Sequence, residues 1–312
     1  HEVDETNNVL AIPLPILGID VSTSQETIDW SQVANAGKKF ALVKATSGVL
    51  GTDASFTNNM RAGTAAGLKL GAYHFAYPGY RPANTGVAEA QHFLSIAAGY
   101  VDFGYLRPVL DIEDDEDTLH YYPGRTLEKV ALSQWIGDFA EEVKRQTGVD
   151  IIIYCTRDYA RTYLEPSLSV YPYWVVTDDG DPTGMPINMG IWQNWTFKQY
   201  RYGKSGGTCP GVSPPCDLDS INGDLNTLSS LLIGAPPLPS FAGPGGNSLQ
   251  PPSNGKFQMQ ISAPRGRQVT VQASDDLSNW TDVVTVPIVQ GQGTFTDTNA
   301  DSHRARFYRA KP

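Results

Sequence analysis

Short apolar runs with the composition of β-strands alternate with helical segments from residue 16 to residue 231. No other feature constrains the fold as strongly, because repeated strand–helix units place parallel strands in one sheet with helices outside it. A closed barrel accommodates eight such strands. The strand-like runs cover residues 16–21, 40–45, 70–75, 108–113, 151–155, 173–176, 190–194 and 217–219.

Five of these runs are followed by helical segments. Asp29 is a suitable N-cap for a helix from Trp30, and Gly37 ends that helix. Further helices are expected over residues 54–66, 86–98 and 126–148, and the helical pattern weakens after that. We therefore predict an α/β fold, a TIM-like barrel with an irregular last third. A doubly wound open sheet is the alternative.

Composition changes over residues 233–255, where proline and glycine predominate as in a linker. Beyond it, alternating runs indicate a small antiparallel, sandwich-like β domain. These runs lie at 257–262, 268–273, 283–288 and 304–309. We therefore predict a barrel domain at residues 1–232, a linker at 233–255 and an accessory domain at 256–312.

Charge and hydropathy exclude two classes of partner. The net charge is −10 at pH 7, whereas nucleic-acid binding requires a basic face. No apolar run approaches the ~20 residues that span a bilayer, so we expect no membrane span.

The chain begins at His1, as it would after removal of a secretion leader. Cys209 and Cys216 bracket a short turn that a disulfide closes easily, in keeping with a secreted protein, and Cys155 is expected to be a buried thiol.

Asp111 and Glu113 are the residues that most suggest chemistry. Residues two apart on a strand face the same side, with Cα atoms about 6.8 Å apart. Neighbouring carboxylates raise each other's cost of ionising, so one can keep a proton for glycosidic cleavage while the other assists. A solvated acidic turn is the alternative, because residues 114–117 are also acidic. In a barrel, however, Asp20 and Asp217 would converge on the same mouth.

Six short motifs then resemble, in order, those of the family 25 glycoside hydrolases, the Chalaropsis-type lysozymes. The resemblance covers roughly residues 16–231 and implies a (β/α)5(β)3 barrel that cleaves the β-1,4 bond between N-acetylmuramic acid and N-acetylglucosamine in peptidoglycan. It also implies that Glu113 is the general acid and base, with Asp20, Asp111 and Asp217 as partner carboxylates. The motifs are residues 18–22 (GIDVS), 43–46 (VKAT), 71–76 (GAYHFA), 109–113 (VLDIE), 191–193 (IWQ) and 217–223 (DLDSING).

Two positions depart from the family pattern. Ser47 follows the Lys-Ala-Thr motif, where the family often has an acidic residue. Asp219 stands where the family commonly has asparagine. Asp219 is therefore a rival to Asp217 for the site residue of the last strand.

Four residues are candidates for contact with substrate: Tyr73, His74, Tyr77 and Trp192. The resemblance suggests that His74 lines the site beside Tyr73, and a hydrogen-bonded core histidine is the alternative. Tyr77 and Trp192 offer ring faces to sugars, although ordinary packing would also explain them. No His or Cys pair has zinc-ligand spacing, so we expect no metal and no cofactor.

The leading interpretation is a secreted, monomeric muramidase whose partner is the glycan strand of peptidoglycan. A chitinase-like β-N-acetylglucosaminidase and a catalytically silent wall-glycan-binding protein are the alternatives. The Asp111–Glu113 pair argues against a silent binder, which has little need of two adjacent carboxylates. For the accessory domain, wall binding, surface sorting and spacing all remain open.

Overall fold

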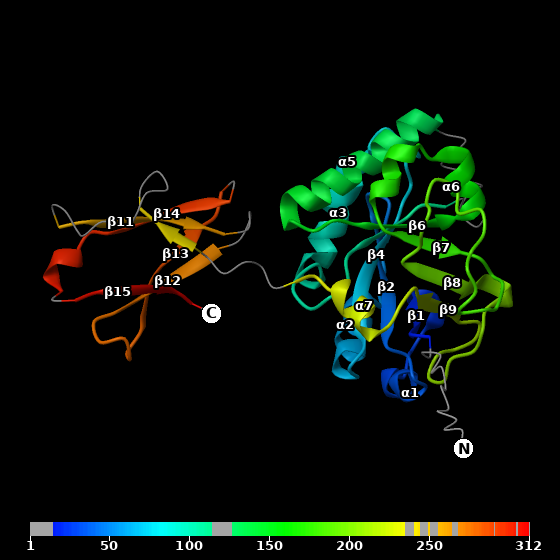
Figure 1. Ribbon diagram of the computed structural model, residues 1–312, viewed down its shortest axis with the longest axis horizontal. Helices are drawn as coiled ribbons and strands as arrows, with labels where there is room; N and C mark the ends of the chain where they lie inside the picture. Colours follow the sequence, from blue (N-terminus) through cyan, green and yellow to red (C-terminus); the bar gives the residue numbers. More distant parts are fainter. Residues whose placement is uncertain are drawn as a thin grey trace, which may run out of the picture.

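Eight strands close into a barrel in the computed structural model, which describes residues 15–113, 127–234, 240–243, 249, 255–263, 268–289, 291–303 and 305–311 (Figure 1). Around the barrel the order is β1, β9, β8, β7, β6, β5, β4 and β2, and β2 pairs with β1 to close it. The strands are β1 (Leu17–Val21), β2 (Phe40–Ser47), β4 (Lys69–Phe75), β5 (Val109–Asp111), β6 (Ile152–Thr156), β7 (Tyr173–Val176), β8 (Phe197–Arg201) and β9 (Asp217–Ile221), with β3 (Gly51–Thr52) added to the end of β2.

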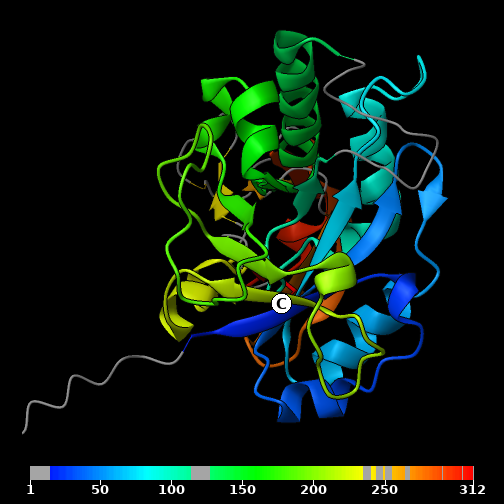
Figure 2. The same ribbon diagram turned by 90° about the vertical axis from the view of Figure 1, so that its right-hand side faces the viewer.

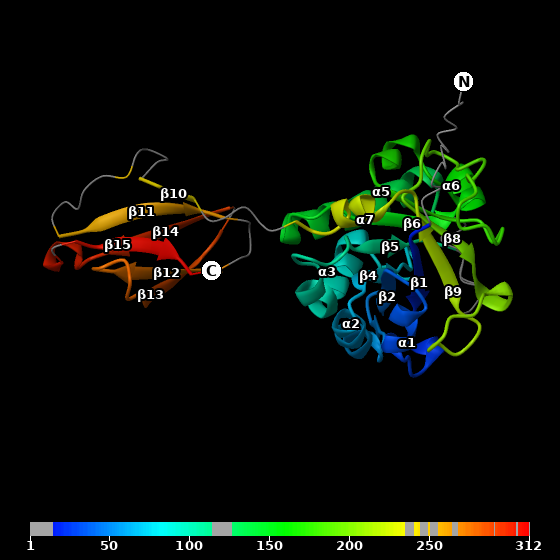
Figure 3. The same ribbon diagram turned by 60° about the horizontal axis from the view of Figure 1, so that its bottom comes forward.

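Helices follow the first five barrel strands and cover the outside of the sheet (Figures 1 and 3). The last three barrel strands lack such crossover helices, and β9 runs antiparallel to both β1 and β8. The barrel is therefore the irregular (β/α)5(β)3 form, and the open-sheet alternative is wrong. The α-helices are α1 (Trp30–Asn35), α2 (Phe56–Ala65), α3 (Gly86–Ala97), α5 (Lys129–Thr147), α6 (Arg157–Tyr163) and α7 (Leu225–Ser230); 3-10 turns cover Thr23–Gln25, Ala98–Tyr100, Pro166–Val170, Gly203–Ser205 and Ala300–Ser302.

Local signals explain the helix ends. The Asp29 carboxylate accepts the backbone N–H of Gln32 at 3.1 Å, so it caps α1 as predicted. Gly37 and Gly67 follow α1 and α2 with φ of 87° and 89°, a backbone region that favours glycine. Gly148 ends α5 in the same left-handed conformation.

The seventh barrel strand was predicted at the wrong place. Residues 190–194 form turns, because Gly190 has a φ of 67° and Trp192 packs outside the barrel against Tyr173. The strand is β8, whose buried polar residues Lys198 and Gln199 hid its strand pattern. Lys198 is enclosed because its ammonium group donates to the Asp181 and Gly184 carbonyls and pairs with Asp179.

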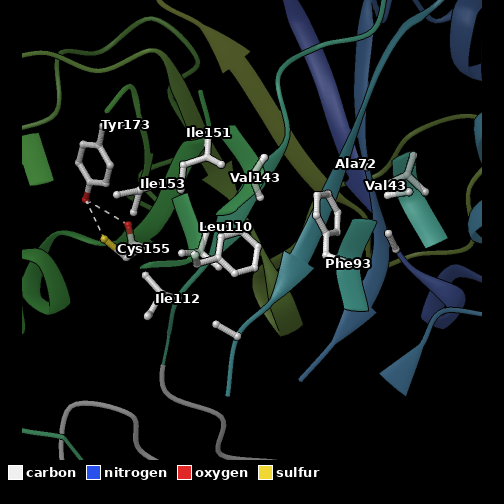
Figure 4. Close-up of a cluster of buried hydrophobic side chains, with 14 of the residues drawn as sticks. Val43, Ala72, Phe93, Leu110, Ile112, Val143, Ile151, Ile153, Cys155 and Tyr173 are labelled. Atoms are coloured by element: carbon white, nitrogen blue, oxygen red, sulfur yellow. Dashed lines mark hydrogen bonds between the residues drawn. The ribbon is translucent and has the colours of Figure 1, made fainter. Parts of the chain in front are cut away.

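Two apolar clusters lie on the two sides of the barrel wall. Alternate residues of each strand point inward, and their side chains fill the barrel below its mouth. The interior cluster includes Phe40, Leu42, Tyr73, Val109, Ile152, Tyr154, Trp174, Val176, Phe197 and Ile221. The larger outer cluster joins the strands to the helices, and Figure 4 shows part of it.

The described strands between residues 240 and 310 form two antiparallel three-stranded sheets with a hydrophobic cluster of their own (Figures 1 and 3). One sheet contains β10 (Ser240–Ala242), β11 (Phe257–Ser262) and β14 (Gln292–Asp297); the other contains β13 (Thr281–Pro287), β12 (Gln268–Ser274) and β15 (Phe307–Ala310). The predicted accessory β fold is thus present. Its strand β10 lies inside the segment expected to be a linker, and β14 was not predicted.

The three cysteines are all thiols in the structure. Cys155 is fully buried beside the Tyr173 hydroxyl, as expected (Figure 4). The expected Cys209–Cys216 disulfide is not formed. Instead each thiol donates to a neighbouring backbone carbonyl, Cys209 Sγ to Pro210 at 3.7 Å and Cys216 Sγ to Asp217 at 3.5 Å.

A chain that ends at Gly234 should fold and unfold within about 4 °C of the barrel transition in the full chain. The segment around Ile233, at the end of this shortened chain, belongs to the barrel domain. The Ile233 N–H donates to the Tyr105 carbonyl at 2.7 Å, and the Gly104 N–H donates to the Ile233 carbonyl at 3.0 Å. A chain that ends at Ser230 is the matched control and should be less stable. Calorimetry checks both; loss of cooperative unfolding in the longer chain would contradict the domain division.

Candidate active site

Strand alternation brings acidic side chains from three strands to the mouth of the barrel, above the interior apolar cluster. Asp20 on β1 lies opposite Asp217 on β9, and Asp111 on β5 lies two residues after the inward-facing Val109. Glu113 follows β5 and is half-buried, whereas Asp20 and Asp111 are buried. The negative charges of these four residues all act on the Tyr154 hydroxyl and raise its pKa, in addition to the effect of burial. The predicted convergence of Asp20, Asp111, Glu113 and Asp217 is therefore present.

A chain of hydrogen bonds supports these carboxylates from below. The Tyr154 hydroxyl donates to Gln199 Oε1 at 2.9 Å, and Gln199 Nε2 donates to Asp20 Oδ2 at 2.7 Å. Trp174 Nε1 donates to Asp219 Oδ1 at 3.0 Å. These contacts fix the orientation of Asp20 and Asp219 in the barrel interior. Figure 2 shows β1 and β9 side by side on this part of the wall.

The charges of Asp20 and Asp219 act on each other in the barrel interior. Asp219 Oδ2 is enclosed and receives no hydrogen bond from any N–H or O–H group of the described residues. Burial is the main cause that raises the pKa of Asp20 well above its usual range, and the neighbouring charge of Asp219 adds to it.

Burial also raises the pKa values of Asp217 and Asp219, each to about 8. The charge of Asp20 contributes to the shift of Asp217. The two residues of β9 differ in position. Asp219 has no exposed surface, whereas Asp217 is half-buried at the mouth and accepts the Gly203 N–H at 3.0 Å. Of the two rivals, Asp217 is therefore the one that a ligand in the mouth can contact.

Tyr73 lies at the top of the interior cluster, where burial and the charges of Asp20, Asp111 and Asp217 raise the pKa of its hydroxyl. Tyr77 is half-buried on the loop that follows β4. Both of these candidates thus lie on the mouth side of β4.

The structure does not bring His74 or Trp192 to the mouth. His74 alternates with Tyr73 and faces outward, where it has no exposed surface and stacks on Phe139. Its ring bonds to Thr46 Oγ1 at 2.7 Å and to Glu89 Oε2 at 2.8 Å, so it is the hydrogen-bonded core histidine that was the alternative. Trp192 is stacked on Tyr173 with ring centroids 4.1 Å apart, outside the barrel.

Four residues of the mouth and its support were missed by the sequence reasoning: Lys44, Tyr154, Trp174 and Gln199. Strand periodicity contained a signal for three of them, because each lies two residues after an interior residue: Leu42, Ile152 and Phe197. Gln199 was missed because its strand was placed at 190–194. Lys44 is the cation of this group, and its ammonium lies 4.4 Å from the centre of the Phe75 ring.

The site suits proton transfer rather than metal binding. Within the described ranges, no group of three or more His, Cys, Asp and Glu side chains is arranged to hold a metal ion. Asp20 and Asp217 are largely buried and their charges act on each other, so their raised pKa values keep protons on these carboxyls at higher pH than usual. Such a set can donate a proton to a leaving oxygen and stabilise developing positive charge.

The unfolding free energy should fall as the pH rises from about 5 to 8, because the folded chain keeps protons on Asp20, Asp217 and Asp219 that the unfolded chain has already lost. Asp219→Asn removes one such proton and should flatten this slope. Relative to the unmodified protein, the unfolding free energy of the variant should improve by more than about 1 kcal/mol between pH 5 and pH 8. The matched control is Asp158→Asn, whose carboxylate is 83% exposed. Urea titrations at several pH values measure the unfolding free energy of the unmodified protein and of both variants. Equal slopes against pH in these three proteins would contradict a retained proton on Asp219.

Comparison with known proteins identifies the family of the barrel. Residues 19–210 match the model of glycosyl hydrolases family 25. Lysozyme M1 of Streptomyces globisporus is 35% identical over 224 residues, which are 69% of this chain and 71% of that protein. The N,O-diacetylmuramidase of Chalaropsis is 27% identical over 232 residues, 70% of this chain and 100% of the relative.

Solved structures agree with this match. The bacterial lysozyme of Streptomyces coelicolor superimposes with a TM-score of 0.62 and 33% identity, over 70% of this chain and 97% of that one. A family GH25 lysozyme from Aspergillus fumigatus gives a TM-score of 0.58 and 28% identity, over 71% of this chain and 100% of the other. The barrel, its ordered motifs and its converging carboxylates thus agree with the sequence match: the chain belongs to glycosyl hydrolases family 25.

Proposed function

We propose that the protein is a lysozyme that cleaves the β-1,4 bond between N-acetylmuramic acid and N-acetylglucosamine in peptidoglycan. The observation that carries this proposal is the convergence of Asp20, Asp111, Glu113 and Asp217 at one barrel mouth. The names of the relatives support the choice of substrate, because they include lysozymes and muramidases. The chitinase-like and silent-binder alternatives receive no such support.

Glu113 is the residue best placed to act as general acid. It is half-buried just after β5, whereas Asp111 is buried at the last position of that strand. In the proposed reaction Glu113 protonates the glycosidic oxygen as the bond to the muramic C1 breaks, and Asp111 orients the 2-acetamido group whose oxygen closes on C1. Water then adds to C1 and returns a proton to Glu113. This sequence consumes one water and leaves the enzyme unchanged.

The protein is proposed to act outside the cell that makes it, because its polymeric substrate lies in the wall. We also propose that it acts as a monomer. No helix of the described chain combines the length and the apolar character needed to cross a membrane. Its substrate is a neutral glycan backbone with attached peptides, so the acidic mouth is aimed at sugar oxygens rather than at a charged group.

Glu113→Gln should fold normally and lose at least about 100-fold in turnover, because an amide cannot protonate the leaving oxygen. The matched control is Glu141→Gln, an exposed residue of α5, which should keep full activity. Release of reducing ends from purified peptidoglycan, with chitin measured in parallel, gives the readout. Retention of more than about a tenth of the turnover would remove Glu113 from this role.

Asp217→Asn should lower kcat on peptidoglycan by about tenfold or more, because it removes a carboxyl that faces the mouth. Asp219→Asn keeps a hydrogen-bonding group below the mouth and should lower kcat much less. Steady-state rates of the two variants at one pH decide between them. The reverse order would make Asp219 the site residue of β9.

A further inference from the structure

A small pocket lies beside the mouth and is not used by the proposed reaction. We call it the rim pocket; its walls are residues 47–51, after β2, together with Tyr77, Tyr80, Arg81 and Asn84, after β4. Its volume is about 170 Å³. At about 30 Å³ per water molecule, it has room for roughly six waters. A sugar pair is too large for it, and one or two small amino-acid residues are the right size.

The rim pocket begins level with the proposed catalytic strand. Ser47, Phe75 and Asp111 are register partners on three adjacent strands, and the Ala76 N–H donates to the Asp111 carbonyl at 2.9 Å. Two strand spacings separate β2 from β5, which places the pocket on the order of 10 Å from Asp111. A group attached to a sugar in the mouth can reach across this distance. The ligand of the rim pocket can therefore belong to the same glycan strand that is bound in the mouth.

The wall that follows β4 is held in place before any ligand arrives. The buried Glu89 carboxylate accepts the Tyr77 N–H at 3.0 Å and the Asn84 Nδ2 group at 2.7 Å. Trp135 Nε1 donates to the Asn84 carbonyl at 2.8 Å. The outward-facing His74 bonds to the same Glu89, which gives this histidine a role in supporting the wall. A pre-formed wall loses little conformational entropy on binding.

The pocket presents an anion-binding group and ring faces. The Arg81 guanidinium lies 5.2 Å from the centre of the Tyr80 ring, and the Tyr77 and Tyr80 rings are 5.8 Å apart. Arg81 is exposed and takes no part in the salt bridges found between described residues. Asn84 is buried and belongs to the pre-formed wall, with its side-chain oxygen enclosed.

These features fit a short peptide that carries a carboxylate. Arg81 can pair with the carboxylate, and the tyrosine rings with the 78% exposed Leu50 can cover small apolar side chains. In peptidoglycan, such a peptide is attached to the lactyl group of muramic acid. The carboxylates of the mouth repel it, so a cationic pocket beside the mouth is where it would be held.

We propose that the rim pocket binds the stem peptide carried by the muramic acid residue in the mouth, with Arg81 as a specificity-determining residue. This proposal rests on the proposed lysozyme function. It predicts that the enzyme distinguishes glycan strands that carry peptides from strands that do not.

The test compares soluble glycan strands that carry stem peptides with the same strands after an amidase has removed them. The amidase leaves the lactyl carboxylate on the sugar, so the two substrates differ in the peptide itself. Arg81→Gln should lower kcat/KM on peptide-bearing strands by about fivefold and leave it unchanged on stripped strands. The loss should shrink at high salt, because the ion pair is partly exposed. Arg61→Gln, an exposed arginine of α2, is the matched control.

Each outcome decides the matter. A loss confined to peptide-bearing strands, absent in Arg61→Gln, supports the pocket. An equal loss on both substrates, or no loss on either, overturns the assignment of Arg81 and its pocket while the lysozyme function stands. Failure of the unmodified protein to release reducing ends from either substrate would instead overturn the proposed function itself.

Discussion

The pairing of β9 with β1 is the interaction on which the site depends. It joins the last strand of the barrel to the first, and its register sets Asp217 opposite Asp20. Because side chains alternate along a strand, the same register places Asp219 one layer deeper, where it reaches Trp174 and Asp20. A shift of one residue would turn both aspartates of β9 outward and leave the mouth without them.

Burial and charge repulsion act together on this arrangement. An isolated carboxylate in a barrel interior is costly, and two adjacent carboxylates are more so. The structure limits the cost by hydrogen bonds from Gln199 to Asp20 and from Trp174 to Asp219, and by raised pKa values that keep these carboxyls protonated at higher pH. The mouth therefore keeps several carboxyl groups without full ionisation, which is the condition that acid-catalysed glycoside cleavage requires.

The sequence predicted the parts that depend on local patterns. Periodicity located the first six barrel strands, and glycines and the Asp29 cap located helix ends. It failed where burial of a polar group reversed the pattern. Lys198 and Gln199 hid β8, and the outward position of His74 follows from strand alternation that the motif alone does not reveal. Trp192 was misjudged because an aromatic ring in a motif packs in the core as readily as it binds a sugar.

The identity of the sugar at the newly formed reducing end tests the central claim most directly. Purified peptidoglycan digested by the protein can be reduced with borohydride and the reduced sugar identified by mass spectrometry. A muramidase releases reduced N-acetylmuramic acid in this experiment, because the bond proposed to break lies on the C1 side of that residue. Reduced N-acetylglucosamine in its place would contradict the account and indicate a glucosaminidase.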